Sequence, residues 1–228
     1  YISFNLSDFT FSTDIIWDII KVGLPASLSM IVMAVGQGVF NKILVHISVN
    51  TVAAYQVAGR LDMLVFLPIF SIAASLTTLV GMFYGAKEYG ALRYIIKYGI
   101  FSALLITIIS STIVYTFAGH VVRFFTDDAS IVIIAVNFLQ IFAFAYPFIS
   151  VGITTGRVLQ GLGKGLPVLI ITIVRVLGVS APLALFFVFI MDKTVEWVWY
   201  SMMLSTIVAF GIGLTWLIST LKTLPASR

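Results

Sequence analysis

Six long apolar stretches dominate this sequence, and each is long enough to cross a membrane. A bilayer core of about 30 Å needs roughly 20 residues of α-helix, and a helix satisfies its own backbone polar groups in lipid. None of the stretches alternates apolar and polar residues as a membrane β-strand does. The pattern predicts an all-α membrane protein with six transmembrane helices, at about Val22–His46, Ala53–Val80, Ile95–Ala118, Ile131–Ile153, Leu166–Ile190 and Val198–Ile218.

The composition excludes the common alternatives. Of the 228 residues, 61% are apolar and 10% are charged, whereas soluble globular domains are about 45–50% apolar and about 25% charged. A soluble fold would therefore lack the charged side chains to cover its surface. Disordered and collagen-like chains are excluded by the same composition.

The basic residues predict how the chain lies in the membrane, because cytoplasmic loops carry an excess of Lys and Arg. The six spans place at most three of them on one side, namely Lys42, Arg123 and Lys193. They place eight on the other: Lys21, Lys87, Arg93, Lys97, Arg157, Lys164, Lys222 and Arg228. We expect a multi-pass protein of the plasma membrane with both chain ends in the cytoplasm. This distribution explains the net charge of +4 without nucleic-acid binding.

The segments outside the spans are short. Residues 1–13 are polar, and a short helix is expected from Thr13, capped by Ser12 or Thr13. That helix either lies at the membrane interface or continues directly into the first span. The chain begins with Tyr1 and shows no signal-peptide pattern, so we expect a piece of a longer protein.

Three charged residues lie inside spans, where each costs roughly 2.5–3.5 kcal/mol at the centre. They are Arg60 and Asp62 in the second span and Arg175 in the fifth. One interpretation is that Asp62 binds a cation or proton in a cavity, with Arg60 or Arg175 tuning it. The other is a buried ion pair that holds the helices in register. The sequence leaves both open.

Uncharged polar residues also occur inside the spans. They either line a common cavity and offer hydrogen bonds to a substrate, or join neighbouring helices to one another. Prolines inside several spans remove backbone hydrogen bonds and predict bends, as transporters that rock between states often have. The polar candidates are Gln37, Asn41, Tyr55, Gln56, Asn137, Gln140 and Tyr146.

Signals for catalysis are weak. The chain has no Cys, and its two histidines, His46 and His120, lie at predicted span ends without metal-binding spacing. No glycine-rich loop ends in Gly-Lys-Ser or Gly-Lys-Thr, as ATP binding would need. We expect neither an enzyme nor a bound metal or cofactor.

Three strings carry a resemblance to a known family. VGLPASLS starts at Val22 and opens the first span. AAYQVAGRLDMLVFLPIFSIAASLTTLVGMFYGAKEYGALRYIIKYG starts at Ala53, and GRVLQGLGKGLPVLIITIVRVLG starts at Gly156. In this order and spacing, the chain resembles the second half of the multidrug and toxic compound extrusion (MATE) transporters over about Val22–Lys222.

The resemblance implies a transporter of twelve helices in two six-helix lobes. This chain would be the C-terminal lobe, with residues 22–222 as the lobe, 1–21 as an inter-lobe linker and juxtamembrane helix, and 223–228 as a cytoplasmic tail. Such transporters export cationic or amphipathic compounds by antiport with Na⁺ or H⁺. The implied partners are small organic cations, membrane lipid and the missing N-terminal lobe.

Two departures from the family pattern concern the coupling ion. Some members carry a Glu in the seventh helix and an Asp in the tenth, but the matching stretches here, Met30–Ala34 and Tyr146–Ser150, hold no acid. Coupling then rests either on Asp62 or on an acid of the missing lobe. A related flippase for lipid-linked saccharides, with the same two-lobe architecture, stays open as an alternative.

Overall fold

The computed structural model describes residues 12–225, and these form six membrane-length helical rods. Five rods are α1 (Thr13–Ile47), α2 (Val49–Gly85), α3 (Tyr89–Arg123), α4 (Ala129–Gly161) and α7 (Glu196–Lys222). The remaining rod is continuous from Leu166 to Ile190 and comprises α5 (Leu166–Ile173), η2 (Val174–Ser180), α6 (Ala181–Leu185) and η3 (Phe186–Ile190). The predicted all-α fold with six spans is confirmed.

Most helices extend beyond the apolar stretches that predicted them. The second helix, for example, continues five residues past Val80 to Gly85. A helix keeps its backbone hydrogen bonds after it leaves the hydrocarbon region, so a prediction from hydropathy alone underestimates its length. The first helix begins at Thr13, with Ser12 as its N-cap, and passes residue 21 without a break. The division of the chain at residues 21 and 222 stays a prediction.

Short polar caps make the turns between helices. Ser48 ends α1 and starts α2, since its backbone N–H donates to the Leu44 carbonyl at 3.0 Å and its hydroxyl accepts from the Thr51 backbone N–H at 3.1 Å. Asp128 caps α4 in the same way, accepting from the Ser130 backbone N–H at 2.8 Å. Such caps satisfy N–H groups that have no partner within the helix.

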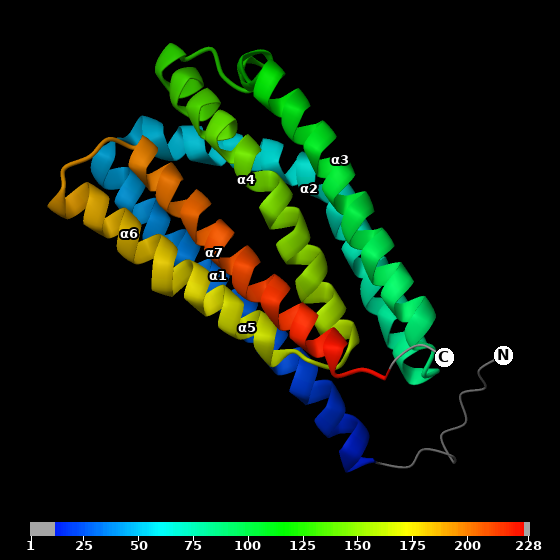
Figure 1. The fold of residues 1–228 in the computed structure, drawn as a ribbon. Coiled ribbons are helices and arrows are strands. Elements are labelled where there is room, and N and C mark those ends of the chain that lie inside the picture. Colours follow the sequence, from blue (N-terminus) through cyan, green and yellow to red (C-terminus); the bar gives the residue numbers. More distant parts are fainter. Residues whose placement is uncertain (1–11, 226–228) are drawn as a thin grey trace, which may run out of the picture.

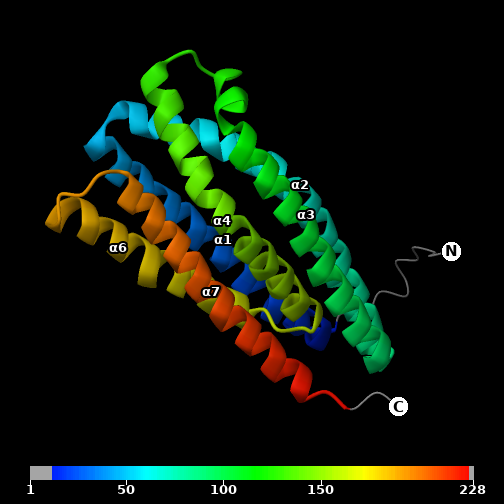
Figure 2. The same cartoon turned by 45° about the horizontal axis from the view of Figure 1, so that its top comes forward.

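The rods form two groups of three that meet along α4 and α7 (Figures 1 and 2). One group holds α2, α3 and α4, and the other holds α1, α7 and the rod of α5 to η3. The first turns of α1 extend past the other helices (Figure 1). Trp17 and Ile19 in that extension are each 65% exposed, as expected for side chains at a membrane interface.

One end of the bundle, here called the basic end, carries most of the cations. The up-and-down order of the helices brings Lys21, Lys87 and Lys222 to this end, with Arg93 and Lys164. Arg93 crosses from α3 to α7, where its Nη2 donates to the carbonyls of Leu221 and Leu224 at 3.3 and 3.1 Å. Arg228 of the predicted cytoplasmic group and the predicted linker residues 1–11 lie outside the described residues.

The prolines are accommodated in two ways. Pro25, Pro68 and Pro147 lie inside α1, α2 and α4, which remain α-helical on both sides of each proline. In the fifth rod, the seven-residue π-helix η2 directly precedes Ala181 and Pro182. Wider π-type turns arise where a normal hydrogen bond is missing, and they are frequent at functional sites.

Candidate functional site

A cavity of about 160 Å³ lies where α1, α2, α4, η2 and α7 converge. It combines an acid, a guanidinium and several hydroxyls with aromatic and thioether side chains. Pockets of this kind, apolar with a few convergent polar groups, are typical of small-molecule sites. Its lining comprises Met33, Gly36, Gln37, Phe40, Tyr55, Asp62, Phe138, Phe142, Ile149, Arg175, Val176, Ser180, Met202, Ser205 and Thr206.

Asp62 and Tyr146 form the acidic part of the site. The Tyr146 hydroxyl on α4 donates a hydrogen bond to Asp62 Oδ1 on α2, across 84 positions of sequence. Tyr146 is completely buried, and the ring of Phe66 packs edge-on against it with centroids 5.4 Å apart. This packing holds the phenol in place, so the carboxylate is fixed at the cavity wall by a charge-assisted hydrogen bond.

Arg175 supplies the basic part of the site from the π-helix η2. Among residues 12–225, no carboxylate lies within 4 Å of its guanidinium, and no hydrogen bond holds it. The next residue, Val176, packs tightly on α1, where a Cβ added at Gly36 would clash with Val176 Cγ1. The glycine thus lets α1 come close enough to share one cavity with the arginine.

An aromatic cluster closes one side of the cavity and joins three helices. Phe138 stacks on Phe142 with centroids 4.2 Å apart and meets Trp199 edge-on at 4.9 Å. Tyr55 stacks on Trp199 at 5.8 Å. Trp199 is completely buried, so the cluster is a rigid wall, and flat apolar surfaces of this kind favour aromatic or aliphatic ligands.

The structure brings together some of the predicted polar residues. Gln37, Tyr55, Asp62 and Arg175 line the cavity, and Tyr146 reaches it through Asp62.

The other predicted residues lie outside the cavity lining. Arg60 is exposed. Gln56 Nε2 donates to Asn41 Oδ1 at 3.5 Å, a contact between neighbouring helices. Asn137 Oδ1 is buried without a hydrogen-bond partner among the described residues. Gln140 is half-buried.

Sequence reasoning missed the hydroxyls of Ser180, Ser205 and Thr206, which line the cavity. Ser205 and Thr206 donate to the Met202 carbonyl at 2.7 and 3.0 Å. Small hydroxyls of this kind are common in membrane helices, so no sequence signal distinguishes these three from the others.

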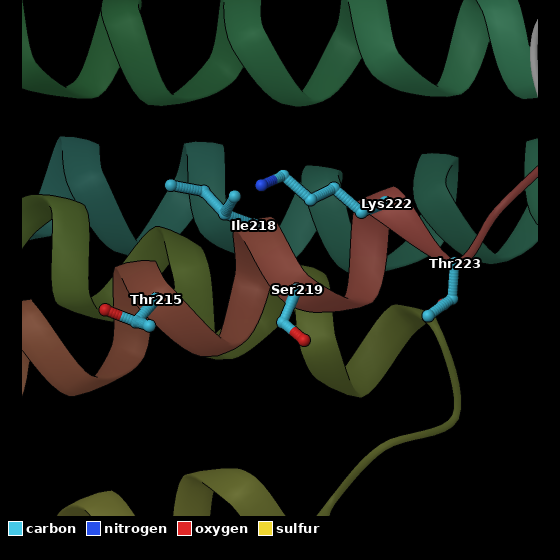
Figure 3. A pocket seen from close by; sticks show the side chains of 5 residues that line it. All are labelled: Thr215, Ile218, Ser219, Lys222 and Thr223. Carbon is cyan, nitrogen blue, oxygen red and sulfur yellow. The ribbon is translucent and has the colours of Figure 1, made fainter.

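A larger hollow, of about 430 Å³, lies at the basic end (Figure 3). Thr215, Ile218, Ser219, Lys222 and Thr223 line it, and all five belong to α7 or the residue after it. The five residues are spaced as neighbours on one face of α7 (Figure 3). One face of a single helix does not surround a ligand, so the smaller cavity is the candidate site.

Comparison with known families decides what this bundle is. The MatE family model matches residues 25–186 of the chain. The chain belongs to the MATE family. The match includes four of the five elements that line the cavity and stops before α7.

Individual curated relatives match large parts of the chain in sequence. The probable multidrug resistance protein NorM of Thermotoga maritima is 28% identical over 167 residues, which cover 73% of this chain and 36% of NorM. The multidrug export protein MepA of Staphylococcus aureus is 28% identical over 148 residues, which cover 65% of this chain and 33% of MepA.

Solved structures extend the match to nearly the whole chain. A MATE protein in its straight conformation superposes with a TM-score of 0.91 at 29% identity, covering 98% of this chain and 50% of that protein. A MOP-superfamily transporter from Pyrococcus furiosus superposes with a TM-score of 0.88 at 30% identity, with the same coverage. The chain thus spans about half of these structures and is one lobe of a two-lobe MATE fold.

Proposed function

We propose that this chain is the C-terminal lobe of a secondary active efflux transporter that exports cationic or amphipathic compounds by antiport with Na⁺ or H⁺. The observation that supports this most directly is Asp62, a carboxylate held by Tyr146 at the edge of a cavity with aromatic walls. Its family relatives include proteins named for multidrug resistance and multidrug export.

The proposed mechanism follows from the two chemical parts of the cavity. The aromatic and thioether walls contact the apolar body of the compound, while the Asp62 carboxylate attracts a positive charge. An inward-moving H⁺ or Na⁺ competes for the same carboxylate. Binding shifts a transporter between its inward- and outward-open states only if the ion binds the two states with different affinity. Because Asp62 and Tyr146 belong to different helices, a relative movement of α2 and α4 changes that affinity.

The proposal includes the setting of the lobe. In the proposed setting the protein crosses the plasma membrane with its basic end in the cytoplasm, which the excess of basic residues on the predicted cytoplasmic side supports. Membrane lipid surrounds the bundle, and the N-terminal lobe covers the side of the cavity that this chain leaves open. Small organic cations are the substrates. The transported Na⁺ or H⁺ is the coupling ion, and transport requires no cofactor.

The decisive experiment uses the full-length transporter, reconstituted in proteoliposomes with an imposed pH or Na⁺ gradient. Export of a cationic fluorescent dye is measured for the wild type, for Asp62→Asn and for Asp192→Asn as a control on a loop. We expect gradient-driven export that Asp62→Asn reduces at least tenfold and Asp192→Asn leaves unchanged. Unchanged export by Asp62→Asn would assign coupling to the other lobe, and no export by the wild type would refute the proposed function.

A further inference from the structure

We propose that one exposed face of α7 binds an anionic phospholipid, with the phosphate at the basic end and an acyl chain along the helix. The inference goes beyond the proposed efflux function and does not depend on it. It concerns an element that lies beyond the residues matched by the family model. This surface, here called the lipid face, comprises Leu204, Ile207, Gly211, Ile218, Ser219 and Lys222.

The first argument is a concentration of cations around the last turn of α7. Lys222 itself is the last residue of the helix. Arg93 reaches this turn from α3, where its Nη2 donates to the Leu221 carbonyl at 3.3 Å. Lys164 reaches it from the turn between α4 and α5, where its Nζ donates to Thr220 Oγ1 at 3.3 Å. Three separate segments thus bring three positive charges to one turn.

The second argument is the lack of a counter-charge. Among residues 12–225, no carboxylate lies within 4 Å of Arg93, Lys164 or Lys222, and this includes Glu88 at the start of α3. The carbonyl and hydroxyl that Arg93 and Lys164 contact are neutral. Like charges held together repel one another, and an anion that enters among them removes this repulsion. A phosphate group does so and also offers several acceptor oxygens to the Lys and Arg donors.

The third argument is the apolar track that leads to the cations. Leu204, Ile207 and Ile218 are 48, 38 and 45% exposed, and their spacing places them on the same side of α7 as Lys222. Gly211 lies between them, and a Cβ added there would meet no atom within 4 Å. The track therefore has room for an acyl chain against the helix.

The charged and apolar parts of the lipid face adjoin. Figure 3 shows the Lys222 side chain running back along α7 towards Ile218, as long basic side chains do when their stems cover apolar surface. The hollow of about 430 Å³ beside them is open on one side, which suits a lipid because its other side faces the bilayer.

The position and charge of the face favour an anionic lipid over other anions. Lys222 ends a helix of membrane length, so it lies at the level of the head groups. Basic clusters at this level are typical binding sites for anionic lipids. A free phosphate would leave the apolar track uncovered. A zwitterionic lipid brings its own cation, which the three basic residues repel.

The test locates the lipid with a phosphatidylglycerol that carries a photoreactive diazirine in one acyl chain. The full-length transporter is reconstituted in phosphatidylcholine nanodiscs with a small fraction of this lipid, irradiated and digested, and labelling of α7 is measured by mass spectrometry. We expect labelling at least tenfold stronger than with a phosphatidylcholine that carries the same diazirine. Soluble glycerol phosphate should not displace the label, and its displacement would assign the site to free phosphate and overturn the proposal.

The variants remove charge without removing the Arg93 contact. A basic residue beside an anionic membrane lipid changes binding roughly fivefold. Lys164→Gln combined with Lys222→Gln should therefore lower the labelling ratio of the two lipids at least fivefold and leave phosphatidylcholine labelling unchanged. Lys222→Arg keeps the charge and should keep the ratio.

A matched control removes a cation from the same end of the bundle. Lys87→Gln, between α2 and α3, should change the ratio less than twofold. An equal fall in Lys87→Gln and in the double variant would show a diffuse field rather than a site, and would overturn the proposal. An unchanged ratio in the double variant, or no labelling of α7 by either lipid, would overturn it as well. Gradient-driven dye export by the wild type would leave the efflux function standing in each of these cases.

Discussion

At the scale of single residues, close backbone contacts decide which small side chains the fold requires. A Cβ added at Gly161, the last residue of α4, would lie 2.7 Å from the Thr77 carbonyl oxygen of α2. A backbone atom inside a packed helix cannot move aside, so this glycine sets the α2–α4 distance. The glycines of the pattern Gly152-x-x-x-Gly156 meet nothing closer than 3.7 Å, although that spacing is typical of close helix packing.

The two kinds of glycine should respond oppositely to the same change. Gly161→Ala forces α4 away from α2, and overpacking of this kind costs about 1–3 kcal/mol. Gly152→Ala adds a methyl group into open space inside a helix, which is worth about 0.5–1 kcal/mol of stabilisation. Thermal unfolding of the full-length transporter in detergent should show a lower midpoint for the first and an equal or higher midpoint for the second. A lower midpoint for both would mean that the free space at Gly152 is filled by the other lobe.

Asp128 provides a pH-dependent prediction at the same scale. Hydrogen bonds from the Ser130 hydroxyl and from the backbone N–H groups of Ile131 and Ser130 lower the pKa of this exposed carboxyl below its ordinary value. A lowered pKa in the folded state contributes stability above the unfolded pKa of about 3.9 and loses it as the pH falls. Asp128→Asn keeps the cap but removes the titration. The thermal unfolding midpoint of the wild type, relative to that of Asp128→Asn, should therefore rise from acidic to neutral pH. A difference between the two midpoints that does not change with pH would contradict this.

At the scale of elements, the six helices follow from the sequence, but the contacts between them do not. Length and hydropathy are properties of one segment, and they predicted every span. The cost of burying charge singled out Asp62 and Arg175 before any neighbour was known. The partner of Asp62 was not predictable, because Tyr146 lies 84 positions away on another helix. The position of Arg175 depends on the π-helical turns of η2, which no periodicity in the sequence signals.

Arg93 connects two elements at the basic end and gives a prediction at this scale. Its guanidinium donates to the carbonyl of Leu221 in the last turn of α7 and to that of Leu224 just after the helix. The last C=O groups of a helix lack partners within it, and the helix dipole favours a cation there. Arg93→Ala should destabilise this end by about 1–2 kcal/mol. Amide exchange in the last turn of α7 should accelerate correspondingly. Lys97→Ala, one turn further along α3 and exposed, should leave that exchange unchanged.

At the scale of the whole molecule, most of the helices contribute to the cavity. Five of the six rods contribute lining residues, with η2 counted as part of the rod that runs from Leu166 to Ile190. Only α3 contributes no lining residue. Meanwhile α1 exposes Met30 at 74% and Ile31 at 58%, close in sequence to the cavity residues Met33 and Gln37. The chain spans about half of the structures it resembles, so this face is available to a second lobe. The two lobes would then close one cavity between them.

The orientation of the whole molecule yields the last prediction. Eight cations against three predict that the basic end lies in the cytoplasm. Because the chain contains no Cys, single cysteines can be introduced without background from this lobe. In a full-length transporter whose remaining cysteines are replaced, Lys193→Cys should react in intact cells with a membrane-impermeant maleimide. Lys87→Cys should react only after the cells are opened, because it lies between α2 and α3 at the basic end. The reverse pattern would invert the lobe and place the Asp127–Asp128 turn in the cytoplasm, and the inward-moving ion would then enter from the basic end.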